Sequence, residues 1–149
     1  MKFVALVMLA VALVSCNRDP NYRKKMYLES GNTYFKRAKY KEASIFYRRA
    51  LAQDPNVPGA WAKLGVAYKD KDCKGCRSRA LDALRRATQV DPTDAVAHHE
   101  LGYLYKDDGR RREAIAEFRR YLDLRPDAGD AFTVQDDIYY LQEESRRAP

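Results

Sequence analysis

One order of aromatic, small and proline residues occurs three times in this chain, largely at a spacing of 34 positions. Gly31 and Gly65 are separated by 34 positions, and so are Pro92 and Pro126. The copies contain, in order, Tyr27, Gly31, Tyr34, Ala43, Tyr47 and Pro55; Trp61, Leu64, Gly65, Tyr68, Ala80, Leu84 and Pro92; and His98, Leu101, Gly102, Tyr105, Ala114, Phe118 and Pro126. A period of this length predicts a stack of equivalent units that complete their hydrophobic core against their neighbours.

The residue types within each copy favour two packed helices. The glycine and alanine positions are small, as required where two helix backbones approach closely, and the aromatic and leucine positions fill the space between them. Proline lacks the N–H group that continues a helix, so each closing proline marks the end of a second helix. The sequence therefore predicts an all-α chain.

The second copy, Trp61-Ala-Lys-Leu64-Gly65-Val-Ala-Tyr68, resembles the opening of a tetratricopeptide repeat (TPR). The resemblance implies an α-solenoid of three TPR helix-turn-helix repeats over residues 24–128, divided at about 24–57, 58–94 and 95–128. It also implies a non-catalytic protein-interaction or assembly module whose first helices line a concave groove. Its partner would be a peptide or a helix of another protein.

Residues 129–149 are predicted to form a capping helix and tail. Phe132 and Tyr139 repeat the aromatic positions, Asp136 replaces the glycine, and the end of the segment is polar. A half-polar helix of this kind covers the apolar end of a repeat stack. A partner surface along Tyr139, Tyr140 and Leu141 is the alternative interpretation.

The second copy contains three additional residues between its two helices. Tyr68 and Ala80 are 12 positions apart, whereas the other copies use nine, and the longer turn contains Cys73 and Cys76. In an oxidising compartment this pair predicts a local disulfide of modest stabilising effect, because the ring that it closes is small. Reduced, inert thiols are an alternative, and a thiol-redox function is a further one. Redox Cys-x-x-Cys motifs normally adjoin a strand, and the sequence predicts none.

Residues 1–15 are predicted to be a lipoprotein signal peptide. Lys2 precedes an apolar run of 12 residues, Phe3 to Val14, which is too short for the ~20 residues of a membrane-spanning helix. Leu13-Val14-Ser15-Cys16 resembles the lipobox of bacterial lipoproteins, which implies cleavage and acylation, palmitate included, at Cys16. Residues 16–23 would then be a lipidated linker. An ordinary secretory signal is the alternative.

The same resemblance implies a cell-envelope protein that is attached to the membrane by lipid. Asn17 follows the cysteine, where an aspartate retains many Gram-negative lipoproteins in the inner membrane. In such a cell, outer-membrane attachment facing the periplasm is expected. Nucleic acid is not an expected partner of an exported protein.

Neither an enzyme nor a metal or cofactor site is predicted. Adjacent helical residues point about 100° apart, so His98 and His99 cannot easily face one ion, and no carboxylate lies at ligand spacing from them. The sequence contains no glycine-rich phosphate loop and no nucleophile elbow.

Two surfaces are candidates for binding. Assigned by family position, the groove residues are Asn32, Phe35, Lys36, Val66, Lys69, His99, Tyr103 and Lys106. Leu28 occupies the place of the first lysine in chaperone-binding members, so recognition of a C-terminal carboxylate is not predicted. A basic surface is expected from Arg48, Arg49, Arg85, Arg86, Arg119 and Arg120, which occupy the same two positions of all three second helices. It is either a solvated helix face or, as an adaptor, a strip for anionic envelope polymers or lipid headgroups.

Overall fold

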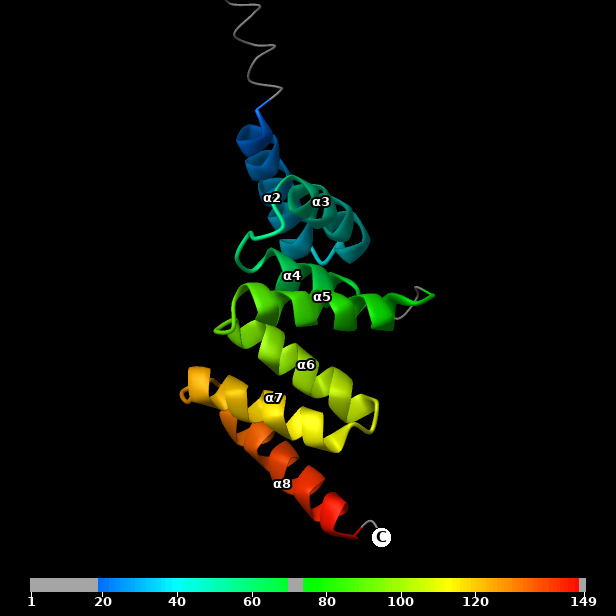
Figure 1. The fold of residues 1–149 in the computed structure, drawn as a ribbon, viewed down its shortest axis with the longest axis vertical. Helices are drawn as coiled ribbons and strands as arrows, with labels where there is room; N and C mark the ends of the chain where they lie inside the picture. The colour runs from blue at the N-terminus through cyan, green and yellow to red at the C-terminus, as the bar shows by residue number, and fades with distance from the viewer. Residues whose placement is uncertain (1–18, 70–73, 148–149) are drawn as a thin grey trace, which may run out of the picture.

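The computed structural model describes residues 19–69 and 74–147, and this part of the chain is entirely helices and turns. Its helices are α2 (Pro20–Lys36), α3 (Tyr40–Gln53), α4 (Ala60–Ala67), α5 (Cys76–Val90), α6 (Ala95–Asp107), α7 (Arg111–Leu124) and α8 (Ala131–Arg147). They follow one another along the long axis of the molecule, from α2 at one end to α8 at the other (Figure 1). The all-α prediction is confirmed.

The helix ends follow from the local sequence. Asp19 precedes α2 and accepts a hydrogen bond of 2.8 Å from the backbone N–H of Asn21, and Asp94 caps α6 in the same way. This cap and Pro20 start α2 four residues before the predicted beginning of the repeats at residue 24. At the other ends, α3, α5 and α7 each stop two residues before one of the repeat prolines.

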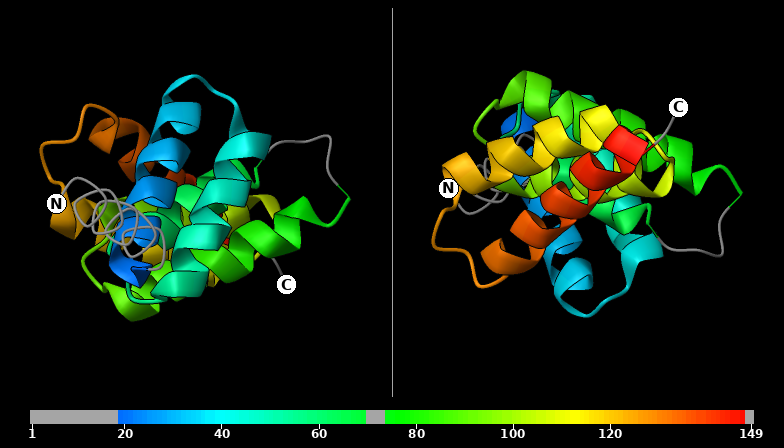
Figure 2. Two further views of the ribbon diagram at one scale, coloured as in Figure 1. Left: turned by 90° about the horizontal axis from the view of Figure 1, so that it is seen from above. Right: turned by 90° about the horizontal axis from the view of Figure 1, so that it is seen from below.

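The helices pack as three pairs and a single terminal helix. α2 packs on α3, α4 on α5 and α6 on α7, while α4, α6 and α8 pack on the preceding second helix. The first helices also touch one another, α2 with α4 and α4 with α6. Viewed along the stack, the pairs lie over one another (Figure 2). This is the predicted solenoid.

Each pair is closed by a glycine facing a large side chain. A Cβ atom at Gly31 would lie 2.9 Å from the Tyr47 ring, and one at Gly102 would lie 2.4 Å from two carbons of the Phe118 ring. The corresponding atom at Gly65 would lie 2.5 Å from Leu84 Cγ. The predicted close approach of the two helices at these positions is therefore present in all three pairs.

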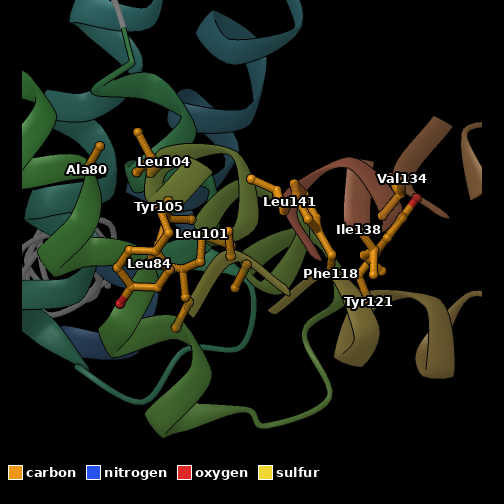
Figure 3. Packing of buried hydrophobic residues seen from close by; sticks show 14 residues of the cluster. Ala80, Leu84, Leu101, Leu104, Tyr105, Phe118, Tyr121, Val134, Ile138 and Leu141 are labelled. Carbon is orange, nitrogen blue, oxygen red and sulfur yellow. The ribbon is translucent and has the colours of Figure 1, made fainter. Parts of the chain in front are cut away.

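The buried side chains form two clusters. The N-terminal core consists of Ala43, Tyr47, Leu51, Ala60, Leu64 and Ala83. The C-terminal core is larger and includes Leu84, Leu101, Tyr105, Phe118, Val134, Ile138 and Leu141 (Figure 3). Trp61 and Tyr68 are partly buried against both clusters, so the second repeat joins the two halves of the molecule.

α8 covers the end of the C-terminal core with Val134, Ile138 and Leu141. Phe132 is 88% exposed, and Tyr139 is 64% exposed. Leu141 is only 3% exposed, because it lies two positions after Tyr139 and so points to a different face of α8. The alternative prediction that Leu141 is part of a partner surface is therefore wrong.

Several predictions concern residues outside the described part of the chain. The signal peptide over residues 1–15, lipidation at Cys16 and one half of the Cys73–Cys76 disulfide all lie there. Cys76 begins α5 and is 6% exposed, and its disulfide stays a prediction. Among the described residues, no helix is long and apolar enough to cross a membrane.

Candidate functional site

The predicted groove residues lie on or next to α2, α4 and α6, and polar contacts connect several of their side chains along the stack as far as α8. We call this surface the first-helix face. Four contacts link residues that are 31 positions apart: Asn32–Lys63, Lys69–Glu100, His99–Asp130 and Lys106–Asp137. For three of these contacts, the distance of 31 is one repeat of 34 less nearly one helical turn, so a side chain reaches a partner on the next helix of the face about one turn earlier. Lys69–Glu100 spans the three additional residues of the second repeat, so Glu100 lies six positions, nearly two turns, before the equivalent of Lys69.

Asn32 is held from two sides. Its side-chain oxygen accepts hydrogen bonds of 2.9 Å from the hydroxyl of Tyr47 and from Nζ of Lys63. Phe35 packs edge-on against Tyr47 and Tyr40, with ring centroids 6.2 Å and 5.4 Å apart. These two predicted groove residues thus also stabilise the first repeat and its contact with the second.

His99 lies at the centre of a charged network on the first-helix face. Its Nε2 is 2.8 Å from Oδ2 of Asp130, and its Nδ1 is 3.6 Å from Glu100, which in turn accepts a hydrogen bond from Lys69. The hydroxyl of Tyr121 donates a hydrogen bond to the other carboxylate oxygen of Asp130, Oδ1. The network therefore connects the end of α4, α6, α7 and the start of α8.

The network shifts the pKa values of its members. The Glu100 carboxylate, together with Asp130, raises the pKa of His99 against the opposing effect of burial. Burial acts to raise the pKa of Glu100, but His99 and Lys69 outweigh it and lower this pKa. Burial and the bond to Asp130 raise the pKa of Tyr121 to about 12. The charged forms of the histidine and of both carboxylates are therefore favoured.

His98 has a structural environment. Its Nδ1 is 2.6 Å from a carboxylate oxygen of Glu117, its Nε2 is 3.0 Å from the carbonyl oxygen of Pro92, and the residue is 8% exposed. The bond to Glu117 is the main cause of the raised pKa of His98. Since both ring nitrogens face acceptors, the imidazolium form satisfies both contacts and holds α6 against α7 and the preceding turn.

The sequence shows no carboxylate at ligand spacing from either histidine, but the fold brings a carboxylate to each. Glu117 is 19 positions from His98, and Asp130 is 31 positions from His99, so the packing of the stack creates pairs that short sequence spacing cannot show. In residues 19–69 and 74–147, no group of three or more metal-binding side chains is present.

The remaining predicted groove residues differ in what they offer to a partner. Lys69 and Lys106 are engaged with Glu100 and Asp137, whereas Lys36 is exposed and has no ion-pair partner among the described residues. Tyr103 is half-buried against Phe118 and His99, and Val66 is half-buried on α4. Their roles in binding stay predictions.

The six arginines of the predicted basic surface are exposed, but they do not form one uniform strip. Arg49 lies over the rings of Tyr27 and Phe46, at 5.9 Å and 5.8 Å from their centroids. Arg85 donates a hydrogen bond of 3.0 Å to the hydroxyl of Tyr105. Arg49 therefore packs on aromatic rings of its own repeat, and Arg85 packs on a ring of the next one.

Sequence models of known families match two parts of the chain. One, described as TPR repeat, matches residues 31–72. Another, described as tetratricopeptide repeat, matches residues 95–128. Together they include helices from all three predicted repeats.

Several curated proteins are similar to part of the chain. The chain is 32% identical over 88 residues to the peroxisomal targeting signal receptor of Komagataella phaffii, a match that covers 59% of the chain and 15% of the receptor. It is 30% identical over 97 residues to the E3 ubiquitin-protein ligase CHIP of Arabidopsis thaliana, covering 64% and 34%. The chain thus spans only a minor part of either relative.

Solved TPR domains share the fold over most of their length. The Arabidopsis OM64 TPR domain matches with a TM-score of 0.73 and 21% identity, covering 85% of this chain and 99% of that domain. The first TPR of Spaghetti (RPAP3), bound to the HSP90 peptide SRMEEVD, matches with a TM-score of 0.71 and 21% identity, covering 83% and 94%. Residues 31–72 and 95–128 are therefore tetratricopeptide repeats, which here form part of one α-helical solenoid.

Proposed function

We propose that this chain is a non-catalytic interaction module that binds a segment of a partner protein on its first-helix face. The observation that carries the proposal is the series of contacts that joins α2, α4, α6 and α8 along this face. A segment lying along the stack would meet side chains from successive repeats at once. Two TPR domains of the same fold support the proposal, because they are bound to an HSP90 peptide and an HSP70 peptide.

The charge arrangement of the face favours a polar segment of mixed charge. Lys69 and Lys106 already interact with Glu100 and Asp137. An incoming carboxylate must therefore compete with an internal carboxylate for each lysine, which reduces the gain from a strongly acidic segment. A basic group of the partner must likewise compete with Lys69 or Lys106 for Glu100 or Asp137, which reduces the gain from a strongly basic segment as well.

We also propose that the module is attached to a bacterial envelope membrane through lipidated Cys16. The Leu13-Val14-Ser15-Cys16 sequence supports this proposal. Because α2 begins at Pro20, only three residues separate it from Cys16, and these four steps along the chain would reach no more than ~14 Å. The repeat stack would therefore lie close to the membrane surface.

The binding proposal is tested with two triple variants and the partner recovered by proximity labelling in the native membrane. Lys36→Glu, Lys69→Glu and Lys106→Glu reverse charges on the first-helix face. Such a variant is expected to weaken binding more than tenfold, equivalent to ~1.4 kcal/mol. The affinity of each variant is measured at two salt concentrations.

The matched control carries Arg49→Glu, Arg85→Glu and Arg119→Glu, which reverse the same amount of charge on the second helices. It is expected to change mainly the salt-dependent attraction to anionic surfaces. Loss of partner binding in this variant alone would overturn the proposal and favour an adaptor for anionic envelope polymers.

The membrane proposal is tested with Cys16→Ala. The variant is expected to remain unprocessed or to leave the membrane fraction, since no acyl chain can be attached to alanine. Acyl labelling and membrane fractionation of the variant and the natural chain provide the measurement. A processed, labelled variant in the membrane fraction would contradict lipidation at Cys16.

A further inference from the structure

A hollow of about 460 Å³ opens between α3, α4 and α5, and it uses none of the predicted groove residues. Its apolar lining combines the buried Leu51, Leu64 and Ala83 with the half-buried Trp61 and Tyr68. The volume lies within the ~300–1,000 Å³ that is usual for ligand sites. The hollow can therefore accept a large apolar side chain of a ligand.

The rim of the hollow is positively charged. Arg48 of α3 and Arg79 and Arg86 of α5 line it together with one carboxylate, Asp82. Within residues 19–69 and 74–147, the side chains of Arg48 and Arg79 make no hydrogen bond or ion pair, and the Arg86 side chain donates one hydrogen bond, of 3.4 Å, to Gln89. Three arginines and one aspartate leave a net charge of +2, so the rim attracts carboxylates.

The equivalent place one repeat later has different side chains. Trp61 corresponds to His98, and Ala83 corresponds to Glu117. There, His98 and Glu117 bond to each other at 2.6 Å, whereas Trp61 and Ala83 at the earlier place line the hollow.

The charged side chains around the hollow also differ from their counterparts one repeat later in the partners that they have. Arg85, the counterpart of Arg48, is bound to the Tyr105 hydroxyl, and Arg110 lies 4.3 Å from the centroid of the same ring. Glu113, the counterpart of Arg79, forms an ion pair with Arg110. At the later place the counterparts of Arg48 and Arg79 therefore have partners, whereas the earlier place leaves the guanidinium groups of Arg48 and Arg79 for a ligand.

We propose that this hollow is a second protein-binding site, which accepts an acidic segment with one large apolar side chain between carboxylates. The apolar side chain would lie against Trp61 and Tyr68, and the carboxylates would pair with Arg48, Arg79 and Arg86. Arginine binds carboxylates through two parallel hydrogen bonds, and desolvated tryptophan and arginine contribute strongly to protein interfaces. A sugar or phosphate polymer would use the charges and leave the apolar lining empty.

Trp61 makes the proposal directly measurable, because it is the single tryptophan of the chain and lines the hollow. Its fluorescence is followed while the chain is titrated with an acidic peptide of about ten residues that contains one central phenylalanine. A saturable change is expected. Binding should be at least tenfold weaker for the same peptide with glycine in place of phenylalanine, and for polyphosphate.

Two sets of variants separate the arginines from the cavity itself. Arg48→Ala, Arg79→Ala and Arg86→Ala together are expected to weaken binding at least tenfold. The matched triple, Arg112→Ala, Arg119→Ala and Arg125→Ala, removes the same charge from exposed positions around α7 and should change affinity less than twofold.

Ala52→Phe places a large side chain at the exposed edge of the hollow without changing charge, and it is also expected to abolish binding. Gln135→Phe, at an exposed position of α8, is its control. Circular dichroism verifies that each variant is folded. An unchanged Trp61 signal, equal binding by the glycine peptide or polyphosphate, or full binding by the first triple variant would each overturn the proposal.

Discussion

Replacing Gly102 by alanine should destabilise the protein, although the same change usually stabilises a helix. Gly102 lies inside α6 and faces α7. Alanine is favoured over glycine in a helix interior by ~1 kcal/mol, so helix propensity alone predicts a more stable variant. The contact with the neighbouring helix reverses this expectation.

The magnitude follows from the geometry. The new Cβ atom would lie 2.4 Å from Cδ1 and Cε1 of Phe118, whereas carbon atoms in good contact are ~3.5–4.0 Å apart. The Phe118 side chain is fully buried, so its ring must move by about 1 Å against a packed core. Overpacking of this kind costs ~1–3 kcal/mol, and two close ring carbons place Gly102→Ala near the upper value. After the gain in helix propensity, a net loss of ~2 kcal/mol is expected.

Gly31 and Gly129 provide controls within the same chain. At Gly31 the nearest ring carbons of Tyr47 are 2.9 Å away, and at Gly129 a Cβ atom would have no neighbour within 4 Å. The loss in the free energy of unfolding should therefore be largest for Gly102→Ala, smaller for Gly31→Ala and near zero for Gly129→Ala. Phe118→Leu should reduce the effect of Gly102→Ala, because it removes the ring that the methyl group meets.

Urea unfolding followed by circular dichroism provides the measurement. A loss of ~2 kcal/mol should also lower the Tm by roughly 6–10 °C in a domain of this size. If Gly102→Ala is as stable as the natural chain, or if all three glycine variants behave alike, the close approach of α6 and α7 does not control stability at this position.

Two further predictions concern charge and covalent structure. The folded protein raises the pKa of His98 above its unfolded value of ~6.5. The contribution of His98 to stability is therefore complete below the unfolded pKa and is lost as the pH rises through the folded pKa. The Tm should fall between these two pKa values. His98→Gln should flatten this part of the Tm–pH curve, and parallel curves would show that His98 does not cause the slope. Cys73→Ser with Cys76→Ser should lower the free energy of unfolding by ~1–3 kcal/mol, because a disulfide in a short loop restricts the unfolded chain only modestly. Rapid alkylation of the natural chain should find both thiols blocked, and free thiols would contradict the disulfide.

The helix pairs could be predicted from sequence because their causes are local and periodic. The spacing of Gly65, Ala80 and Pro92 marks a close approach within one hairpin and the end of its second helix, and the structure confirms both features. Stacking of the pairs follows, since one hairpin cannot bury its apolar side alone.

The side-chain network of the first-helix face could not be predicted in the same way. The partners of Lys69, His99 and Lys106 lie 31 positions away, and this distance depends on how far one repeat is rotated and shifted on the next. The family positions identify which residues share the face. They do not show that its lysines already have carboxylate partners.

The division of the interior into two clusters has a consequence for how the chain reaches its fold. Each helix packs mainly on its neighbours along the sequence, so native contacts close short loops, and chains of this kind typically fold in microseconds to milliseconds. The N-terminal core is complete with Ala83 and needs no residue of the third repeat. During synthesis, the first two repeats can therefore begin to fold while the third is still being made, with Trp61 and Tyr68 on the edge that the third repeat later covers.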